Sequence, residues 1–392
     1  MLGFRMFDAD NHYYEATDAF TRHLDPAMRR RTMQWADVDG RQRLLVAGAV
    51  NRFIPNPTFA RVSRPGALQD YFRAKAGITD MRAAFGDLDP IEERPEYRDR
   101  EARLRVMDEQ GMEACIMLPT LGVGMEAALE QDPEACAAAF HAFNRWLDED
   151  WGFAHRDRIF AAPYITLVDP GLAAAELEWA IGRGARTVLI RPASVWGVGG
   201  RRTPGDRAHD AFWSRLDESG ITLLVHGGES SYGAYDAIWG LSSEVEAFRV
   251  PPLRRLLSAS PIRDMIASLL ADRVFDRFPN VRVATVETGS DWVRPLLKKL
   301  TSVANQVPGE LGEDPVAAFR EHVWVSPFFE DDVLDLVDAV GADRVLFGSD
   351  WPHAEGLADP ASFVKELDGV DDADVRRIMH GNARDLVTPR PR

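Results

Sequence analysis

Short apolar runs that end at polar residues most constrain the fold of this chain of 392 residues. The run Val345-Leu346-Phe347, for example, is followed by Gly348-Ser349-Asp350. Such a run is typical of a strand in a parallel sheet, because helices cover both faces of the sheet and no polar–apolar alternation is needed. The pattern predicts eight strands, at residues 5–10, 114–118, 159–165, 187–191, 222–226, 282–287, 323–326 and 344–348.

Longer segments with helical periodicity separate these runs. Several of them begin at Asp or Pro and end near Gly, as helix capping prefers. Strands that alternate with helices indicate βα units around a parallel sheet, so the chain belongs to the α/β class, and eight strands favour a closed barrel. We expect helices at residues 133–149, 171–183, 206–219, 291–303 and 331–340.

Two stretches interrupt the repeat. Residues 13–100 are rich in Arg, Asp, Pro and aromatic residues without a strong strand pattern, and we expect them to form an inserted lid or subdomain after the first strand. Residues 230–277 form a long loop insertion after the fifth strand. Loops that follow barrel strands face the active site, so both insertions are expected to shape a substrate pocket. A contact between subunits is the alternative for the second.

Composition narrows the class of protein. The length and a hydrophobic content of 45% allow one large α/β domain or two ordinary ones, and with the strand pattern we expect a single domain spanning residues 1–392. The net charge of -16 argues against a nucleic-acid partner. The two cysteines form no CxxC pair, so we expect neither a disulfide framework nor a thiolate zinc site. No run of about 18 apolar residues could span a membrane and no signal peptide is apparent. A cytoplasmic protein without a membrane partner is expected.

Metal-ligand residues stand at three of the predicted strand ends. Asp10 and His12 are two residues apart in a strand, so their side chains point to the same face. His226 ends the fifth strand, where a core histidine bonded to the backbone is the alternative. Asp350 follows the eighth, and a buried carboxylate is costly unless a cation or hydrogen-bond donors compensate it. Imidazole and carboxylate groups bind divalent ions, so together these four residues predict one metal site.

These residues also carry a family resemblance. Asp10 and His12 on the first strand, His226 on the fifth, Glu287-Thr-Gly-Ser at the sixth and Gly-Ser-Asp350-Trp-Pro-His at the eighth resemble the amidohydrolase superfamily. The similarity is greatest to its aminocarboxymuconate-semialdehyde decarboxylase-like branch. The resemblance implies a (β/α)₈ TIM barrel with one divalent metal ion at its carboxyl-terminal face. It also implies a homodimer.

The resemblance suggests a role for each residue. Asp10 and His12 take the places of the family's His-x-His pair, His226 that of the fifth-strand ligand, and Asp350 that of the eighth-strand carboxylate. Glu287 departs from the pattern, since it stands where most relatives have a catalytic histidine; it could move protons or bind metal. Asp350, Glu287 and His353 are therefore the catalytic candidates. We expect zinc, with manganese or iron as alternatives.

Other residues offer secondary candidates. Arg191 could bind a substrate carboxylate or form a structural ion pair. Trp351 follows a strand end and could face the substrate or pack in the barrel. His353 and Glu355 could line the pocket, and His380 more simply holds the barrel closure. The remaining histidines are expected to be structural: His23, His141, His155, His209 and His322.

Three functions are compatible with these residues, each for a small organic substrate. The first is metal-dependent hydrolysis, in which the ion activates water and Asp350 accepts its proton. The alternative is non-oxidative decarboxylation of an aromatic or unsaturated acid, in which Asp350 or a partner protonates the carbon that loses CO₂. The third is a catalytically inactive binding barrel, which predicts a broken ligand set.

Overall fold

Parallel strands form the centre of the molecule. The computed structural model describes all residues except 1–2, 76, 198–199, 243–250, 258–259 and 392. The parallel strands form two sheets, in the orders β1-β7-β8 and β14-β13-β12-β9. Their strands are β1 (Met6–Tyr13), β7 (Met112–Pro119), β8 (Ile159–Ala161), β9 (Thr187–Ile190), β12 (Thr222–His226), β13 (Arg282–Val286) and β14 (Val323–Val325).

The two sheets join at the end of β8. This strand is shorter than the run predicted at residues 159–165, because Pro163 has no backbone N–H to donate to a neighbouring strand. The chain nevertheless stays beside β9, where Tyr164 forms a parallel bridge with Leu189. The N–H of Ile165 also donates to the carbonyl of Leu189, at 2.8 Å.

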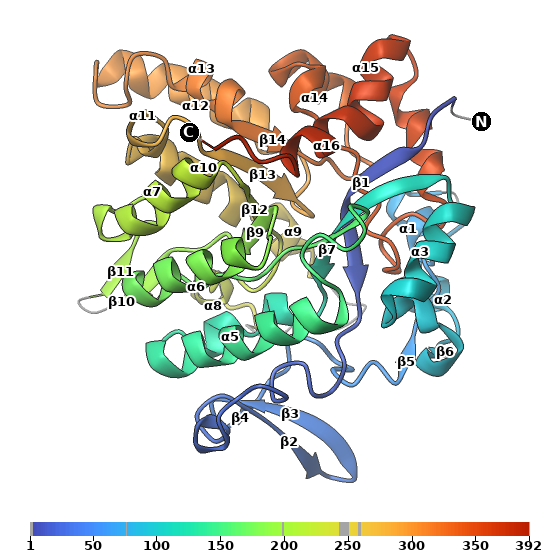
Figure 1. The fold of residues 1–392 in the computed structure, drawn as a ribbon. Coiled ribbons are helices and arrows are strands. Elements are labelled where there is room, and N and C mark those ends of the chain that lie inside the picture. The colour runs from blue at the N-terminus through green and yellow to red at the C-terminus, as the bar shows by residue number, and fades with distance from the viewer. Residues whose placement is uncertain (1–2, 76, 198–199, 243–250, 258–259, 392) are drawn as a thin grey trace.

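The predicted eighth strand closes the ring without being a regular strand. Val345 forms a parallel bridge with Val325 of β14. On the other side, the N–H of Ala9 in β1 donates to the carbonyl of Phe347, at 2.9 Å. The backbone therefore closes into an α/β barrel in which residues 345–347 take the eighth place (Figure 1).

The helices predicted between the strands are present, with ends that differ by a few residues. Aspartates begin several of them: Asp132, for example, accepts the N–H of Ala135 at 3.2 Å. These helices surround the strands in Figure 1. They are α5 (Pro133–Asp150), α6 (Pro170–Gly182), α7 (Asp210–Ser219), α12 (Val293–Gln306) and α14 (Val333–Val340).

Residues 13–100 contain more regular structure than the sequence suggested. An antiparallel sheet, β2 (Met33–Val38), β3 (Arg41–Val46) and β4 (Ala49–Val50), lies below α5 in Figure 1. Its first turn is Asp39-Gly40, and both residues have a positive φ, 54° and 70°, as a two-residue hairpin turn requires. The strands escaped prediction because most of their side chains are at least partly exposed, so they form no continuous buried run. The rest of the segment includes β5 (Arg61–Val62), α1 (Gln69–Phe72), α2 (Met81–Phe85) and β6 (Asp89–Pro90).

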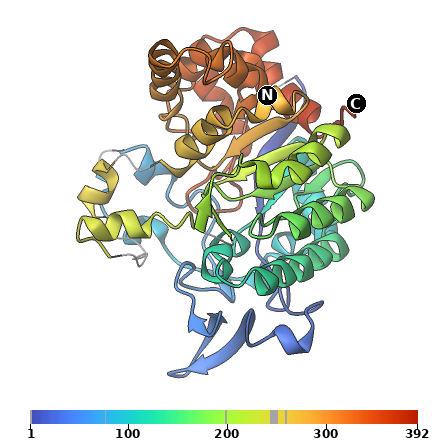
Figure 2. The same cartoon turned by 90° about the vertical axis from the view of Figure 1, so that its left-hand side faces the viewer.

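The segment after β12 divides into two parts. α8 (Gly233–Ile238) and α9 (Pro252–Leu256) project from the barrel, in yellow at the left of Figure 2, and expose Ile238 and Leu256. α10 (Pro261–Ala271) instead buries an apolar face, so it is part of the helical layer. The loop insertion predicted at residues 230–277 is therefore shorter than expected.

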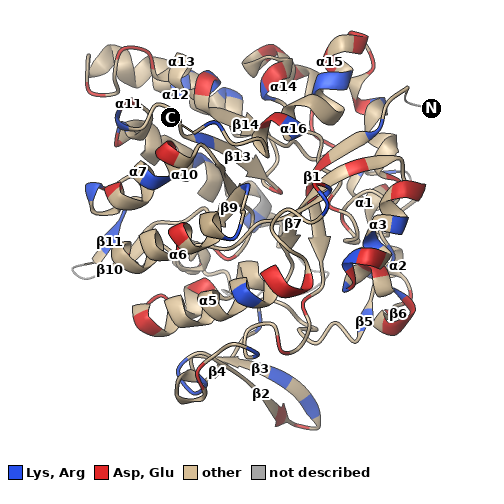
Figure 3. Cartoon of the chain, in the orientation of Figure 1, with Lys and Arg blue, Asp and Glu red and all other residues tan. Residues whose placement is uncertain are grey.

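Short elements complete the fold. They are α3 (Arg100–Glu109), α4 (Glu126–Leu129), β10 (Val195–Gly197), β11 (Gly200–Arg202), α11 (Val274–Arg277), α13 (Pro315–His322), α15 (Asp372–Arg376) and α16 (Asn382–Leu386). Acidic and basic residues are interspersed over the outer helices (Figure 3). Among the described residues, no helix has both the length and the apolar character needed to cross a bilayer.

Candidate active site

β1 delivers the first two candidate ligands to one side of the strand. The Oδ1 of Asp10 lies 3.2 Å from the Nε2 of His12, and both side chains are almost fully buried. Asn11, between them, points the other way, where its Oδ1 accepts a hydrogen bond from Arg103. The period of two in a strand thus separates the residues that face the site from those that hold β1 to α3.

His226 presents a second imidazole to the same point. It ends β12, and its Nε2 lies 3.3 Å from the Nε2 of His12. Its Nδ1 lies 2.5 Å from the carbonyl oxygen of Gly227, which can only accept. This contact puts a proton on Nδ1, so Nε2 is the atom that can offer a lone pair to a metal ion.

Glu287 follows β13 and reaches between the two imidazoles. Its Oε2 lies 3.2 Å from the Nε2 of His12 and 3.1 Å from that of His226. This oxygen is buried, yet no donor meets it with hydrogen-bond geometry. Glu287 has a backbone φ of 48°, in the left-handed region that residues other than glycine rarely adopt.

Asp350 lies on the other side of His12, paired with a third histidine. Its Oδ1 is 3.4 Å from the Nε2 of His12 and 2.6 Å from the Nδ1 of His353. The Nε2 of His353 lies 2.9 Å from the hydroxyl of Thr120, which itself donates to the carbonyl of Tyr13 at 2.8 Å. Because the Thr120 hydroxyl donates its proton to the Tyr13 carbonyl, it accepts a hydrogen bond from the Nε2–H of His353. The Nδ1 atom is then left to share a proton with Asp350.

These side chains form two overlapping groups. Within each group every residue offers one possible ligand atom, and these atoms all lie within 4.8 Å of one another. One comprises Asp10, His12, His226 and Glu287, and the other His12, Glu287, Asp350 and His353. Three carboxylates and three imidazoles converge in this buried place. Without a cation the carboxylates would repel one another, whereas a divalent cation would compensate their charge. The nitrogen and oxygen donors therefore fit the metal that the sequence predicted.

The charges of the cluster shift its protonation. Burial lowers the pKa of His12, but its contacts with Asp10 and Glu287 outweigh burial and raise that pKa to about 9. Burial, and then the charge of Glu287, raise the pKa of Asp350 well above its usual range. Burial opposes ionisation of Glu287 too, yet the charges of His226 and His12 hold its pKa well below the usual value. Of Asp350 and Glu287, Asp350 is thus the carboxyl that keeps a proton more readily.

Asp8 is a supporting residue that the sequence analysis missed. Its carboxylate is fully buried and accepts the N–H of Asp10 at 3.1 Å, the N–H of Ser349 at 2.9 Å and the Ser349 hydroxyl. It therefore fixes the backbone beside Asp10 and beside Asp350. The sequence did offer one sign of this role. Asp8 is a carboxylate within an apolar run, and a buried carboxylate needs hydrogen-bond donors.

Glu15 supports the site from just beyond β1. Its buried carboxylate accepts the N–H groups of Leu121 and Gly122, each at 2.9 Å. It thereby fixes the loop that follows β7. No sequence signal set Glu15 apart from the other acidic residues of the insertion.

The two predicted substrate contacts have protein partners. The guanidinium of Arg191 lies 2.5 Å from Glu130 and 3.4 Å from Glu126, as the structural ion-pair alternative requires. The ring of Trp351 packs against Tyr97, and the guanidinium of Arg103 stacks on it at 4.4 Å. Arg103 binds the side of β1 that faces away from the metal ligands, so Trp351 lies in the packing around the strand.

The other candidates are not members of the two groups. Glu355 is exposed, and His380 contacts Glu113 at 3.1 Å. The remaining histidines take ordinary partners or none: His23 with Glu149, His141 with Glu176, His155 with Glu101, His322 with the Val281 carbonyl, and His209 buried alone.

Loops meet above the carboxyl ends of the strands. The N–H of Glu229, after β12, donates to the carbonyl of Val123, after β7, at 3.0 Å. The insertion joins them, because Asn51 donates to the carbonyl of Gly124 at 3.2 Å and the ring of Phe53 packs against Gly124. The insertion and two barrel loops thus form one continuous cover.

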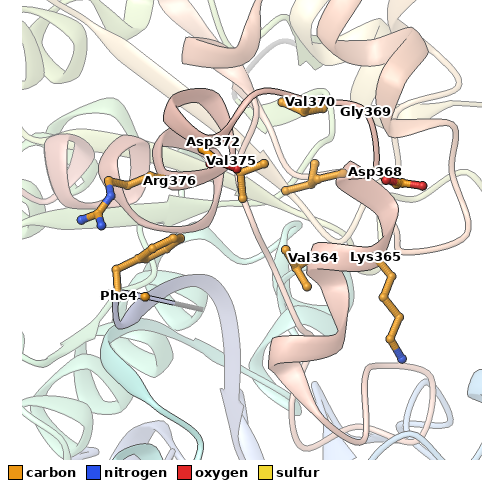
Figure 4. A pocket seen from close by; sticks show the side chains of 11 residues that line it. Phe4, Val364, Lys365, Asp368, Gly369, Val370, Asp372, Val375 and Arg376 are labelled. Carbon is orange, nitrogen blue, oxygen red and sulfur yellow. The ribbon is translucent and has the colours of Figure 1, made fainter. Parts of the chain in front are cut away.

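A cavity of about 730 Å³ lies elsewhere, at the amino-terminal end of β1 (Figure 4). Phe4, Lys365, Asp368 and Arg376 are among the residues that line it. Catalytic groups of α/β barrels lie at the carboxyl ends of the strands, so this cavity is not the candidate site.

Comparison with known proteins identifies the family. A family model described as amidohydrolase matches residues 7–388. The chain belongs to the amidohydrolase family. The match spans the barrel, the insertion and the closing helices, and it confirms the resemblance inferred from the sequence.

Three individual proteins are similar to this chain over most of its length. The chain is 44% identical to an amidohydrolase from Mycobacterium avium subsp. paratuberculosis K-10, whose crystal structure covers 99% of this chain and 100% of its own, with a TM-score of 0.94. It is 25% identical to gamma-resorcylate decarboxylase of Polaromonas sp. strain JS666, over 82% of this chain and 97% of that protein. A dihydroxybenzoic acid decarboxylase structure from Polaromonas sp. JS666, with bound manganese and 2-nitroresorcinol, shares the fold, at 19% identity, 82% and 93% coverage and a TM-score of 0.58.

These findings bear on the expected functions. The chain is an enzyme of the amidohydrolase superfamily, so the inactive-barrel alternative is set aside. The relatives favour the decarboxylase alternative over the hydrolase that we placed first. The ligand cluster and the manganese-bound neighbour support one divalent metal, without support for zinc in particular.

Proposed function

We propose that this enzyme is a metal-dependent, non-oxidative decarboxylase of a small hydroxylated aromatic acid. The curated relative that decarboxylates gamma-resorcylate supports the substrate class. Asp10, His12 and His226 would hold the metal, which when bound neutralises the substrate carboxylate and a neighbouring oxygen. Decarboxylation needs, in addition, an acid that protonates the ring carbon.

The pair of Asp350 and His353 carries this proposal. Asp350 lies beside the metal-ligand cluster, its pKa is raised by burial and by the charge of Glu287, and it shares a proton with His353 at 2.6 Å. A carboxyl that keeps its proton is suited to act as an acid, whereas hydrolysis would require Asp350 to accept a proton from water.

The proposed step conserves atoms and charge. The shared proton moves from Asp350 to the ring carbon that carries the carboxylate. The bond between that carbon and the carboxylate then breaks, its electron pair restores the aromatic ring, and CO₂ leaves. Asp350, now ionised beside His353, regains a proton from solvent before the next turnover. A ring hydroxyl next to the carboxylate assists by donating electron density to the carbon that is protonated.

We assign residues 13–100 as a lid over this site, within a single catalytic domain. The N–H of Gly66 donates to the carbonyl of His353 at 2.9 Å, and that of Leu68 donates to Ala354 at 2.7 Å. With the contact between Asn51 and Gly124, these bonds attach the insertion to the loops after β7 and after the eighth segment. A cover of this kind excludes water, which favours protonation by a residue over hydrolysis.

The test is direct. Protein loaded with Mn²⁺ is mixed with 2,6-dihydroxybenzoate, and CO₂ and resorcinol are quantified; in D₂O, resorcinol should exchange the hydrogen between its two hydroxyl groups. Asp350→Asn should abolish both reactions. Hydrolysis of esters or amides without CO₂ release from any hydroxybenzoate would favour the hydrolase that we first expected.

A further inference from the structure

The position of Glu287 raises a question about the fourth metal ligand. Sequence analysis placed Asp350 in that role. In the structure, however, Glu287 belongs to the group that contains Asp10, His12 and His226, whereas Asp350 belongs to the group that contains His12, Glu287 and His353.

Distances within this group resemble those around one bound ion. The five pairs that can be compared are Asp10–His12 at 3.2 Å, Asp10–His226 at 3.8 Å, His12–His226 at 3.3 Å, His12–Glu287 at 3.2 Å and His226–Glu287 at 3.1 Å. Nitrogen and oxygen atoms bound tetrahedrally at their usual distances lie about 3.3–3.6 Å apart. One oxygen of Glu287 thus lies close to both imidazole nitrogens, at slightly less than this edge length, whereas the Oδ1 of Asp350 lies 3.4 Å from the nitrogen of His12.

The hydrogen bonding of the two carboxylates differs. The Oε2 of Glu287 is buried without a donor of suitable geometry, although two imidazole nitrogens lie within 3.2 Å of it. We infer that the Glu287 oxygen and the two imidazole nitrogens point toward one shared position between them, where an ion could bind, rather than toward each other. Asp350, by contrast, is committed to His353 at 2.6 Å.

The backbone also holds Glu287 beside His226. The N–H of Gly227 donates to the carbonyl of Val286 at 3.1 Å, and Gly227 packs so closely on the Glu287 carbonyl that a Cβ would collide with it. Glu287 keeps its φ of 48° in this contact. Unfavourable backbone angles persist where the surroundings fix them, and they are concentrated at functional sites.

We propose that Glu287 is the fourth metal ligand, with Asp10, His12 and His226, and that Asp350 is thereby free to act with His353 as the proton donor. The role of Asp350 rests on the proposed decarboxylation, whereas the role of Glu287 does not. The metal site then contains two imidazoles and two carboxylates, a donor set suited to manganese as well as zinc.

Metal binding tests the assignment without any substrate. Mn²⁺ affinity is measured by titration calorimetry for the natural protein, Glu287→Gln, Asp350→Asn and Glu355→Gln, the last an exposed carboxylate nearby. Glu287→Gln should weaken binding more than about tenfold, since even residues that only support ligands contribute about 10- to 100-fold. Asp350→Asn and Glu355→Gln should stay within about threefold of the natural protein.

Two spectra distinguish the loss of a ligand from misfolding of a variant. The visible absorption of the Co²⁺-substituted protein should change in Glu287→Gln and stay the same in Asp350→Asn, with far-ultraviolet circular dichroism unchanged in both. Undiminished Mn²⁺ affinity in Glu287→Gln, or an equal loss in Asp350→Asn, would overturn the assignment. If the affinities follow the expectation and no hydroxybenzoate is decarboxylated, the ligand assignment stands and the proposed function fails.

Discussion

Single residues at this site act through the hydrogen bonds that orient them. Thr120 is an example: its hydroxyl donates to Tyr13 and accepts from His353, which directs the other nitrogen of His353 toward Asp350. Metal-binding and proton-transferring imidazoles depend on such partners for their tautomer. Residues without chemistry of their own therefore contribute to turnover.

We expect Thr120→Val to lower kcat by roughly 10- to 100-fold, because Val cannot accept the Nε2 proton of His353. Thr120→Ser keeps the hydroxyl and should restore most of the activity. The pH profile of kcat should shift in the Val variant only. Equal activity in both variants would mean that His353 is oriented by other groups.

Asp8 predicts a dependence of stability on pH. Burial raises its pKa from 3.8 to about 6, so its contribution to stability is complete below about pH 4 and is lost as the pH rises through 6. The loss is roughly 3 kcal/mol, at about 1.4 kcal/mol per pKa unit. The free energy of unfolding is measured by urea titration of chelator-treated protein between pH 4.5 and 7. It should fall with rising pH less steeply in Asp8→Asn than in the natural protein. Parallel curves for the two proteins would contradict it.

At the scale of elements, the predictable part was the one governed by local pattern. The buried runs around Leu224 and Ala284 correspond to β12 and β13, and the helices α5, α6 and α14 lie where capping and periodicity placed them. Asp10, His12, His226 and Glu287 came together because the carboxyl ends of parallel strands share one end of the barrel.

Long-range partners could not be predicted in the same way. The Asp39-Gly40 hairpin is mostly exposed, so no buried stripe marks its strands. Nothing near Trp351 in the sequence indicates Arg103 and Tyr97, which are distant in the chain and decide where its ring packs. The carboxylate partners of Arg191 were likewise invisible before the loops were placed.

The contact between the insertion and the loop after β7 gives a prediction for the lid. Gly124→Ala adds a Cβ that would collide with the ring of Phe53, so the insertion should move away from the loop. We expect KM to rise roughly tenfold with metal content unchanged, since small misplacements of a cover are costly. Gly182→Ala, in α6 and free of neighbours, is the matched control. A KM unaltered by Gly124→Ala would exclude a role for this contact in substrate binding.

For the whole molecule, metal should contribute to stability. The proposed ligands lie on β1, at the end of β12 and directly after β13. These strands belong to two different sheets, so an ion would hold the sheets together. At a free concentration of 1,000 times Kd, binding stabilises by about 4 kcal/mol, or roughly 5 °C in Tm for a chain of this size. Differential scanning fluorimetry with and without chelator measures the shift, and His226→Ala should remove it while His209→Ala should not.

Metal affinity should also fall at low pH. The pKa of His12 is raised to about 9, so its ring must lose a proton before it can bind a cation. Binding measured in buffers of different ionisation enthalpy should release protons, and Kd should rise between pH 8 and pH 6. A Kd independent of pH would contradict the assignment of His12 as a ligand. The homodimer implied by the family resemblance stays a prediction, which light scattering would test.

The first strand and the residues just after it have a consequence for engineering. Asp8 holds the chain of the eighth segment, Asp10 and His12 face the metal site, and Glu15 fixes the loop after β7. Two of the proposed metal ligands, a support of the Asp350 backbone and a support of the loop after β7 therefore lie within eight successive residues. The insertion that follows therefore cannot be transferred to another barrel by itself. Glu15 and the loop at Gly122 would have to be transferred with it.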